Sequence, residues 1–190
     1  MKRGDAWRKL VREDYTRPLS AAGGIAVDSR GFAYAMDTTN YDNHCYGLGE
    51  YRRYPCEANH LIKYAPGGVH GGEGEVWRRR GISPVLGLTC GCGPKGQLNI
   101  DEFDRLFVTD GLCHNIKVFD TAGNLITVIG SYGNEDGAGP DSKCPAPEIA
   151  LCLPAGVDAS RDWCFIADTN NGRIVKCRLV YGMGRTHAID

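Results

Sequence analysis

Apolar and polar residues alternate over short runs along most of this chain, and turn-forming residues separate the runs. The clearest stretch holds four such runs, rich in β-branched and aromatic side chains: Leu98–Ile100, Arg105–Thr109, Ile116–Phe119 and Leu125–Ile129. Runs of this length are typical of strands and are too short for helices. Because Asp, Gly and Asn residues lie between them, the stretch predicts a four-stranded antiparallel meander.

Two further units repeat this order of strands and turns. The strands of the first unit are predicted at Gly24–Asp28, Gly31–Asp37, His60–Tyr64 and Glu75–Arg80. Those of the last unit are predicted at Pro154–Asp158, Trp163–Asp168 and Gly172–Cys177. In every unit an aspartate ends the first strand, and a second aspartate follows nine or ten residues later, at the end of the second strand. This nearly constant spacing indicates that the three units are copies of one small sheet.

The spacing also locates a large insertion in the first unit. Six residues separate the second-strand aspartate from the isoleucine of the third strand in the last two units, whereas 25 separate Asp37 from Ile62. The loop between these strands therefore carries a predicted insertion of 19 residues. Long connections are also expected at 81–96 and 131–153.

Repeats of about 40–50 residues, with four short strands each, predict a β-propeller. We expect one all-β segment over 1–190, with an isolated outer strand at 6–12 and blades at 20–80, 97–130 and 154–180. The last blade lacks an outer strand, which residues 6–12 would supply in a closed ring. Each blade buries its faces against its neighbours, and closed propellers have at least four blades. The prediction is therefore half of a six-bladed ring, completed by a second copy or by missing blades.

Three phrases of the sequence, GIAVD at 24–28, LFVTDG at 106–111 and IADTNNGRIVKC at 166–177, resemble the NHL repeat. The pattern of that family runs roughly G-I-A-V-D, then a glycine, then Y-V-A-D and N-x-R-I. The resemblance covers most of residues 20–180. It implies a propeller whose blades are four-stranded antiparallel sheets.

A closer resemblance lies around Val108–Cys113, which is similar to the peptidyl-hydroxyglycine amidating lyases, NHL-type propeller enzymes with zinc. That family carries D-G-Y-C at this point and a cysteine pair around its A-D-R-E-N-G-R-I turn. The positions of Cys113, and of Cys164 with Cys177, resemble those of the cysteines that form its disulfides. The positions of its tyrosine, its arginine and its zinc-ligand histidine hold Leu112, Thr169 and Ala155. Without these groups, the resemblance implies the fold and not the lyase reaction.

The composition narrows the classes of function. The chain has 190 residues, 26 of them glycine, and a net charge of -1, which gives no electrostatic footprint for nucleic acid. No apolar run is long enough to span a bilayer. The first residues, Met1–Asp5, do not begin an apolar signal segment. Together with the cysteines described next, this favours a fragment, or a mature piece, of a longer exported protein.

Nine cysteines are many for a chain of this length, and none of them forms a CxxC motif. Their pattern favours disulfides in an oxidising compartment over buried thiols, and so an extracytoplasmic location, periplasmic or secreted. The pairs that the spacing suggests are Cys164–Cys177, Cys45–Cys56, Cys144–Cys152, and Cys113 with Cys90 or Cys92. The alternative is a metal site formed by Cys90, Cys92, Cys113 and His114.

Polar residues at the strand ends have two interpretations. The repeated aspartates would either surround a cation or cap turns by accepting backbone N–H bonds, and capping is the commoner role. Arg173, in the phrase that resembles N-x-R-I, would either hold an anionic ligand or clamp a neighbouring carboxylate through a bidentate pair. The structural interpretation is favoured for both.

Histidines lie in loops of matching position in two units. His44 and His60 flank the large insertion, and His114 lies in the equivalent loop one blade later. If these loops share a face, their imidazoles would hold a divalent metal, with Ca²⁺ or Zn²⁺ as candidates. Solvated loop histidines are the commoner arrangement, and no cofactor is required by the sequence.

The preferred hypothesis is an exported, non-catalytic module that binds a protein or a small ligand through its insertion loops, since loops on a rigid scaffold often carry recognition. The candidate contact residues are Tyr41, His44, Tyr46, Tyr51, Arg52, Arg53, Tyr54, His114 and Arg173. The alternative is part of a metal-dependent enzyme, a lyase or lactonase-like hydrolase, whose site is completed by missing blades. A purely architectural repeat is a third interpretation.

Overall fold

The computed structural model describes residues 24–38, 59–66, 74–80, 82, 96–134 and 147–180. Within these ranges the protein is almost entirely β-structure, and the helical element is a single short 3₁₀ helix, η2 (Gly111–Cys113). The predicted all-β class is confirmed. The predicted strand at 6–12 and most of the connection 81–96 lie outside the described residues.

Three antiparallel sheets follow one another along the chain. Blade 1 consists of β1 (Ile25–Val27), β2 (Ala33–Thr38), β3 (Asn59–Tyr64) and β4 (Glu75–Arg80). Blade 2 consists of β5 (Leu98–Ile100), β6 (Leu106–Asp110), β7 (Asn115–Phe119) and β8 (Leu125–Ile129). Blade 3 consists of β11 (Pro154–Ala159), β12 (Trp163–Asp168) and β13 (Arg173–Arg178). Each strand of these three blades begins and ends within two residues of its predicted position.

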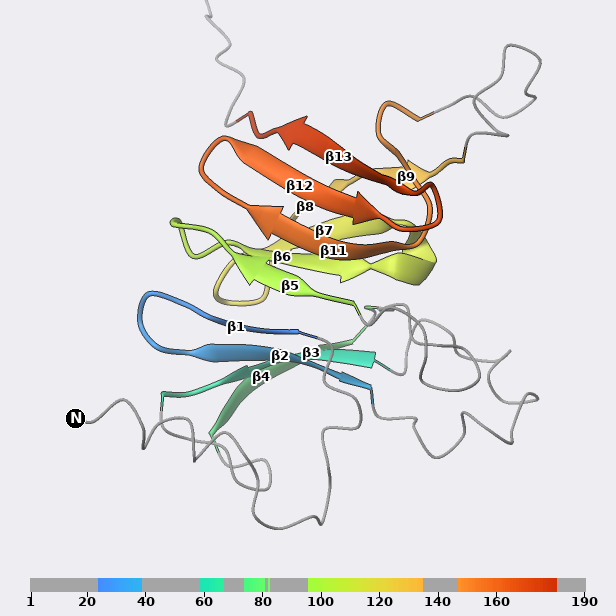
Figure 1. Ribbon diagram of the computed structural model, residues 1–190. Coiled ribbons are helices and arrows are strands. Elements are labelled where there is room, and N and C mark those ends of the chain that lie inside the picture. Colours follow the sequence, from blue (N-terminus) through green and yellow to red (C-terminus); the bar gives the residue numbers. More distant parts are fainter. Residues whose placement is uncertain are drawn as a thin grey trace, which may run out of the picture.

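The three blades are stacked in chain order, as Figure 1 shows. The first strand of each blade lies innermost, so that β5 is in contact with β1 on one side and with β11 on the other. Side-by-side meanders whose first strands adjoin are the arrangement of neighbouring blades in a propeller. The alternation of side chains then gives every blade two faces, one for the preceding and one for the following blade.

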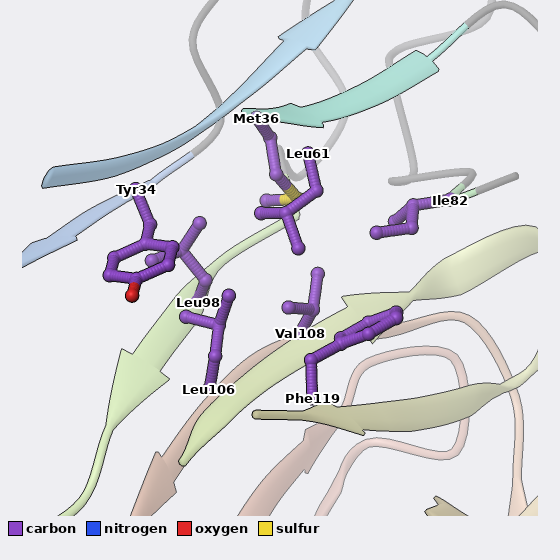
Figure 2. Close-up of a cluster of buried hydrophobic side chains, with 8 residues drawn as sticks. All are labelled: Tyr34, Met36, Leu61, Ile82, Leu98, Leu106, Val108 and Phe119. Atoms are coloured by element: carbon purple, nitrogen blue, oxygen red, sulfur yellow. The ribbon is translucent and has the colours of Figure 1, made fainter. Parts of the chain in front are cut away.

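The interface between blades 1 and 2 is an apolar core. Figure 2 shows its side chains pointing toward one another from both sheets, with Ile82 from the connection beside them. Its buried members are Tyr34, Met36, Leu61, Ile82, Leu98, Leu106, Val108 and Phe119. Since each large side chain removed from water contributes roughly 1.5–3 kcal/mol, this cluster is a main source of the stability of the pair of blades.

A second core joins blades 2 and 3, and it shares no side chain with the first. Phe107, Ile116 and Val118 of blade 2 meet Val157 and Ile166 of blade 3. A third and smaller cluster lies on the opposite face of blade 1, where Ala33, Ala35, Ile62 and Tyr64 are buried. Strict alternation along β2, β6 and β12 separates these faces.

The register of blade 1 corrects the predicted length of its insertion. The residue before the second-strand aspartate lies opposite Ile116 in blade 2 and opposite Ile174 in blade 3. In blade 1 the equivalent residue, Met36, lies opposite Leu61. Leu61, and not Ile62, is therefore the structural equivalent, and the insertion is one residue shorter than predicted.

The connection between blades 2 and 3 contains a feature that was not predicted. Strands β9 (Ser131–Tyr132) and β10 (Ala150–Leu151) form a short parallel pair. Gly130 precedes β9 with a φ of +84°, and a Cβ at this position would lie 2.5 Å from Leu151 Cδ1. The close approach of the two segments therefore requires glycine here.

The predicted disulfides are wrong where the structure tests them. Cys164 and Cys177 face each other across β12 and β13, as predicted, but both are free thiols, and so is Cys152. The expected bridges Cys164–Cys177 and Cys144–Cys152 are therefore absent. Burial in the apolar core raises the pKa of Cys164 to about 12 and also raises that of Cys177, which keeps both as thiols. The other predicted pairs involve cysteines outside the described residues.

In the part of the chain that the structure describes, no helix has the length and apolar character to cross a membrane.

Candidate functional site

The long connection between blades 2 and 3 returns to one edge of these blades. At this edge β6 and β12 end with Asp110 and Asp168, and both carboxylates are fully buried. Backbone groups that follow β10 contact both blades here. We call this region the link edge, defined as the turns 110–115 and 168–173 together with the connecting segments 131–134 and 147–153.

Asp168 is the structural centre of the link edge. Its Oδ1 accepts a 2.6 Å hydrogen bond from the backbone N–H of Cys152, and its Oδ2 accepts bonds from Asn171 Nδ2 at 2.8 Å and Arg173 Nε at 2.9 Å. A buried carboxylate is stable when a cation and hydrogen bonds replace its hydration. Asp168 therefore ties the connection to blade 3.

Arg173 supports the same connection through a second bond. Its other guanidinium nitrogen donates to the carbonyl oxygen of Ala150 at 2.7 Å. The arginine is not a bidentate clamp on one carboxylate, as the sequence predicted, but bridges Asp168 and the backbone of β10. Its side chain is about half exposed, so one side of the guanidinium faces solvent.

The remaining aspartates have mostly structural roles, as predicted. Asp28 accepts the backbone N–H groups of Arg30 and Phe32, and Asp101 does the same at the equivalent turn of blade 2. Asp110 forms an ion pair with Lys117 across the β6–β7 hairpin. Asp158 differs, because it is exposed and accepts from Asn99 of the neighbouring blade.

His114 joins blade 2 to the connection. It follows η2 in the left-handed conformation, with a φ of +56°, and its Nδ1 accepts the backbone N–H of Leu153 at 3.1 Å. The ring of Tyr132 packs edge-on against the imidazole, with 4.7 Å between centroids. Burial lowers the pKa of His114, against the opposing influence of Asp110 and Asp168. The ring is therefore neutral at physiological pH and carries its proton on Nε2.

This arrangement does not fit Ca²⁺ or Zn²⁺. A histidine binds a metal through an unprotonated nitrogen, and the unprotonated Nδ1 of His114 is already occupied by the Leu153 N–H. Across the described ranges, no group of three or more His, Cys, Asp or Glu side chains is placed to hold a metal ion. The side chains of His44 and His60 lie outside the description, so the three-histidine site stays a prediction.

Two of the predicted contact residues, His114 and Arg173, are brought together at the link edge by segment 147–153. The other predicted contact residues lie outside the described residues: Tyr41, His44, Tyr46, Tyr51, Arg52, Arg53 and Tyr54. Sequence reasoning missed Tyr132, whose side chain is 57% exposed beside His114. The sequence signal that could have identified Tyr132 is an aromatic residue at the start of the long connection 131–153.

No protein-family profile matches the chain, and no curated protein sequence matches it. Among solved structures, it is similar to a catalytically inactive virginiamycin B lyase of Staphylococcus aureus with quinupristin, with a TM-score of 0.40 and 13% identity over 85% of this chain and 42% of that one. The selenomethionine-substituted lyase of the same organism gives 0.40 and 12%, over 86% and 43%. A streptogramin B lyase gives 0.41 and 14%, over 85% and 42%. The chain thus spans less than half the length of these proteins, and the similarity concerns the fold alone.

Proposed function

We propose that this protein is a non-catalytic propeller module of the NHL type that binds a protein or small-molecule ligand at the link edge. The observation that carries the proposal is the contact between Tyr132 and His114. There a largely exposed aromatic ring is held on a rigid, hydrogen-bonded base, which is the usual composition of a recognition surface.

The polar groups of the link edge support binding rather than chemistry. Asp168 is engaged by three donors, and the Nδ1 of His114 is engaged by a backbone N–H. Neither group is placed to accept a proton from a substrate. What the edge offers to a ligand is the Tyr132 ring, the Nε2–H of His114 and the solvent side of the Arg173 guanidinium. These groups suit a ligand with an apolar or planar part and carbonyl or carboxylate oxygens.

Assignment to the NHL type rests on where the three family-like phrases fall. GIAVD covers β1, LFVTDG covers β6, and IADTNNGRIVKC covers the β12–β13 hairpin. The phrases thus fall on a first strand, a second strand and a second-to-third-strand hairpin, in the order in which they occur in the NHL pattern. Export is proposed from the number of cysteines, and fractionation of the producing cells tests it.

Binding is tested by thermal-shift screening of the full chain against a library of short peptides and small carboxylate-containing metabolites. Compounds that stabilise the chain are then measured against Tyr132→Ala. The matched control is Leu125→Ala, which alters an exposed apolar side chain of β8. The proposal predicts loss of binding in Tyr132→Ala and retention in Leu125→Ala.

A second variant, deletion of residues 41–56, tests the predicted contribution of the insertion. Binding that survives both Tyr132→Ala and the deletion contradicts the proposal. A library that produces no stabilising compound also counts against it.

A further inference from the structure

Blade 3 has one face that remains open to solvent. Along β12, Cys164 and Ile166 point toward blade 2, whereas Trp163 and Phe165 point the other way. The register of β13 places Lys176 opposite Phe165 and Ile174 opposite Ala167, so that both belong to the second face. We call Trp163, Phe165, Ile174 and Lys176 the outer face of blade 3.

The aromatic position of this face is an interface position in the other two blades. Tyr34 of blade 1 and Phe107 of blade 2 occupy the equivalent place in the second strand, and each points toward the following blade. Both are 1% exposed or less, whereas Phe165 is 39% exposed. Blade 3 thus carries an aromatic residue at the same position, but no following blade covers it.

An aliphatic position on the third strand of each blade also indicates that the outer face of blade 3 lacks a covering blade. Leu61 of blade 1 and Ile116 of blade 2 are fully buried against the next blade. Ile174 is their equivalent by strand register, and it is 75% exposed. Burial of an aliphatic side chain so exposed is favourable, because it removes apolar surface from water.

A lysine on two aromatic rings is repeated in blades 1 and 3. Lys63 lies opposite Tyr34, with its Nζ 4.2 Å from the ring centroid of Phe32 and 5.2 Å from that of Tyr34. Lys176 lies opposite Phe165, with its Nζ 3.9 Å from the centroid of Trp163 and 5.6 Å from that of Phe165. Both blades therefore place a lysine over two aromatic rings at equivalent positions in or next to the second strand.

In blade 1 the next blade supplies a hydrogen-bond acceptor to this lysine. The Nζ of Lys63 donates to the carbonyl oxygen of Thr121, which lies in the β7–β8 turn of blade 2. Lys63 becomes almost fully buried as a result, whereas Lys176 is exposed. The turn of a following blade would supply the corresponding carbonyl oxygen to Lys176.

We propose that the outer face of blade 3 is the docking surface for a further four-stranded β-blade, supplied from outside these 190 residues. That blade places aliphatic side chains on Phe165 and Ile174, as Leu106 and Val108 do on blade 1. The carbonyl oxygen of its outer hairpin turn accepts a hydrogen bond from Lys176.

A second copy of the chain is less suited to continue the stack of blades. The surface that it would have to offer is the opposite face of blade 1, formed by Ala33, Ala35, Ile62 and Tyr64. Each of these side chains is already buried, at 7% exposure or less. A second copy therefore has no bare blade face of the required kind. The proposal does not depend on ligand binding at the link edge.

The test adds a blade to the full chain. A second copy of residues 97–134, the sequence of blade 2, is fused to the C-terminus through a flexible linker. The docked blade is expected to raise the unfolding temperature of the fusion. It is also expected to slow the acetylation of Lys176, followed by mass spectrometry, about tenfold, as for an amine protected by folded structure.

Matched variants assign the effect to the outer face. Phe165→Asp in the fusion is expected to abolish both the gain in unfolding temperature and the protection of Lys176. Leu125→Asp, which also puts a carboxylate in place of an exposed apolar side chain, is expected to retain both. If Phe165→Asp fails to fold by circular dichroism, Lys176→Met serves instead, and a lower unfolding temperature of the fusion is expected.

Two results would overturn the proposal. The first is unchanged acetylation of Lys176 in the fusion, which shows that the face does not accept a blade. The second comes from sedimentation of the unfused chain: a dimer that Phe165→Asp dissociates identifies a second copy as the occupant. A monomer in both cases supports the proposal.

Discussion

The ammonium group of Lys63 in blade 1 donates a 2.7 Å hydrogen bond to the carbonyl oxygen of Thr121 in blade 2. The indole nitrogen of Trp77 donates to the same oxygen at 3.1 Å, and the buried carboxylate of Asp28 lies 3.9 Å from the ammonium group. Burial lowers the pKa of Lys63, and Asp28 opposes this effect. The two blades are thus joined by a charged group as well as by an apolar core.

Replacing Lys63 with methionine is expected to destabilise the protein by about 2–3 kcal/mol, because Asp28 loses a buried cation and Thr121 loses a donor. Urea unfolding measures the change. Lys176→Met is the matched control, since it makes the same substitution at the exposed equivalent position of blade 3. Its expected effect is within about 0.5 kcal/mol. Equal effects of the two substitutions would contradict the role assigned to Lys63.

Stability is expected to depend on the protonation of His114. Its pKa in the folded protein is lowered from the ordinary value of 6.5, mainly by burial. As the pH falls below 6.5, the unfolded chain takes up a proton that the folded chain resists, so the free energy of unfolding decreases. The contribution is fully lost once the pH lies below the lowered pKa. Urea unfolding between pH 7.5 and pH 5, about the range of a histidine titration, measures this dependence.

The control for this prediction is His114→Asn. Asparagine tolerates the left-handed conformation of this position, does not titrate, and has an oxygen that can accept the Leu153 N–H. The variant is expected to lose the part of the pH dependence that His114 contributes. An NMR titration that gives His114 a pKa at or above 6.5 would refute the prediction.

The thiols of blade 3 are expected to react slowly while the protein is folded. Burial raises the pKa of Cys164 to about 12, and only the thiolate attacks alkylating reagents. At pH 8, iodoacetamide should modify Cys164 and Cys177 far more slowly in buffer than in urea, as followed by peptide mass spectrometry. Fast modification of the folded chain would disprove their burial. A mass lower by two hydrogens in that peptide pair would reveal a disulfide instead.

Asp168→Asn is expected to loosen the connection between blades 2 and 3. The variant loses the charge that holds Arg173 and weakens the bond to the Cys152 N–H, with an expected loss of about 2–3 kcal/mol. Hydrogen exchange at the Cys152 amide should become faster. Asp158→Asn is the control, because the Asp158 carboxylate is exposed and accepts a hydrogen bond from Asn99 Nδ2 of the neighbouring blade. Unchanged exchange in Asp168→Asn would show that Asp168 does not anchor the connection.

The strands of this protein could be predicted from sequence because each blade alternates apolar side chains between two faces. The facing of Cys164 and Cys177 followed from their distances to the turn at Asp168 and was found in the register. Their chemical state did not follow from spacing, because it depends on burial in a core made by two blades. The same spacing argument placed Ile62 where Leu61 belongs, since a long insertion carries no register of its own.

The link edge was harder to predict because its contacts join segments far apart in the sequence. His114 was a candidate, but its partner Leu153 lies 39 residues away and contributes only a backbone N–H. Strands β9 and β10 have two residues each, which is too short for any periodicity. Arg173 was correctly associated with a carboxylate. Its second partner is the backbone carbonyl group of Ala150, and the sequence does not single out one backbone carbonyl from the others.

The separation of the two inter-blade cores has a consequence for synthesis on the ribosome. The last side chain of the first core along the chain is Phe119, and that core needs nothing from blade 3. Blades 1 and 2 can therefore close against each other while blade 3 is still being translated. The nascent chain then acquires its hydrophobic interfaces one at a time, from the N-terminal side onward.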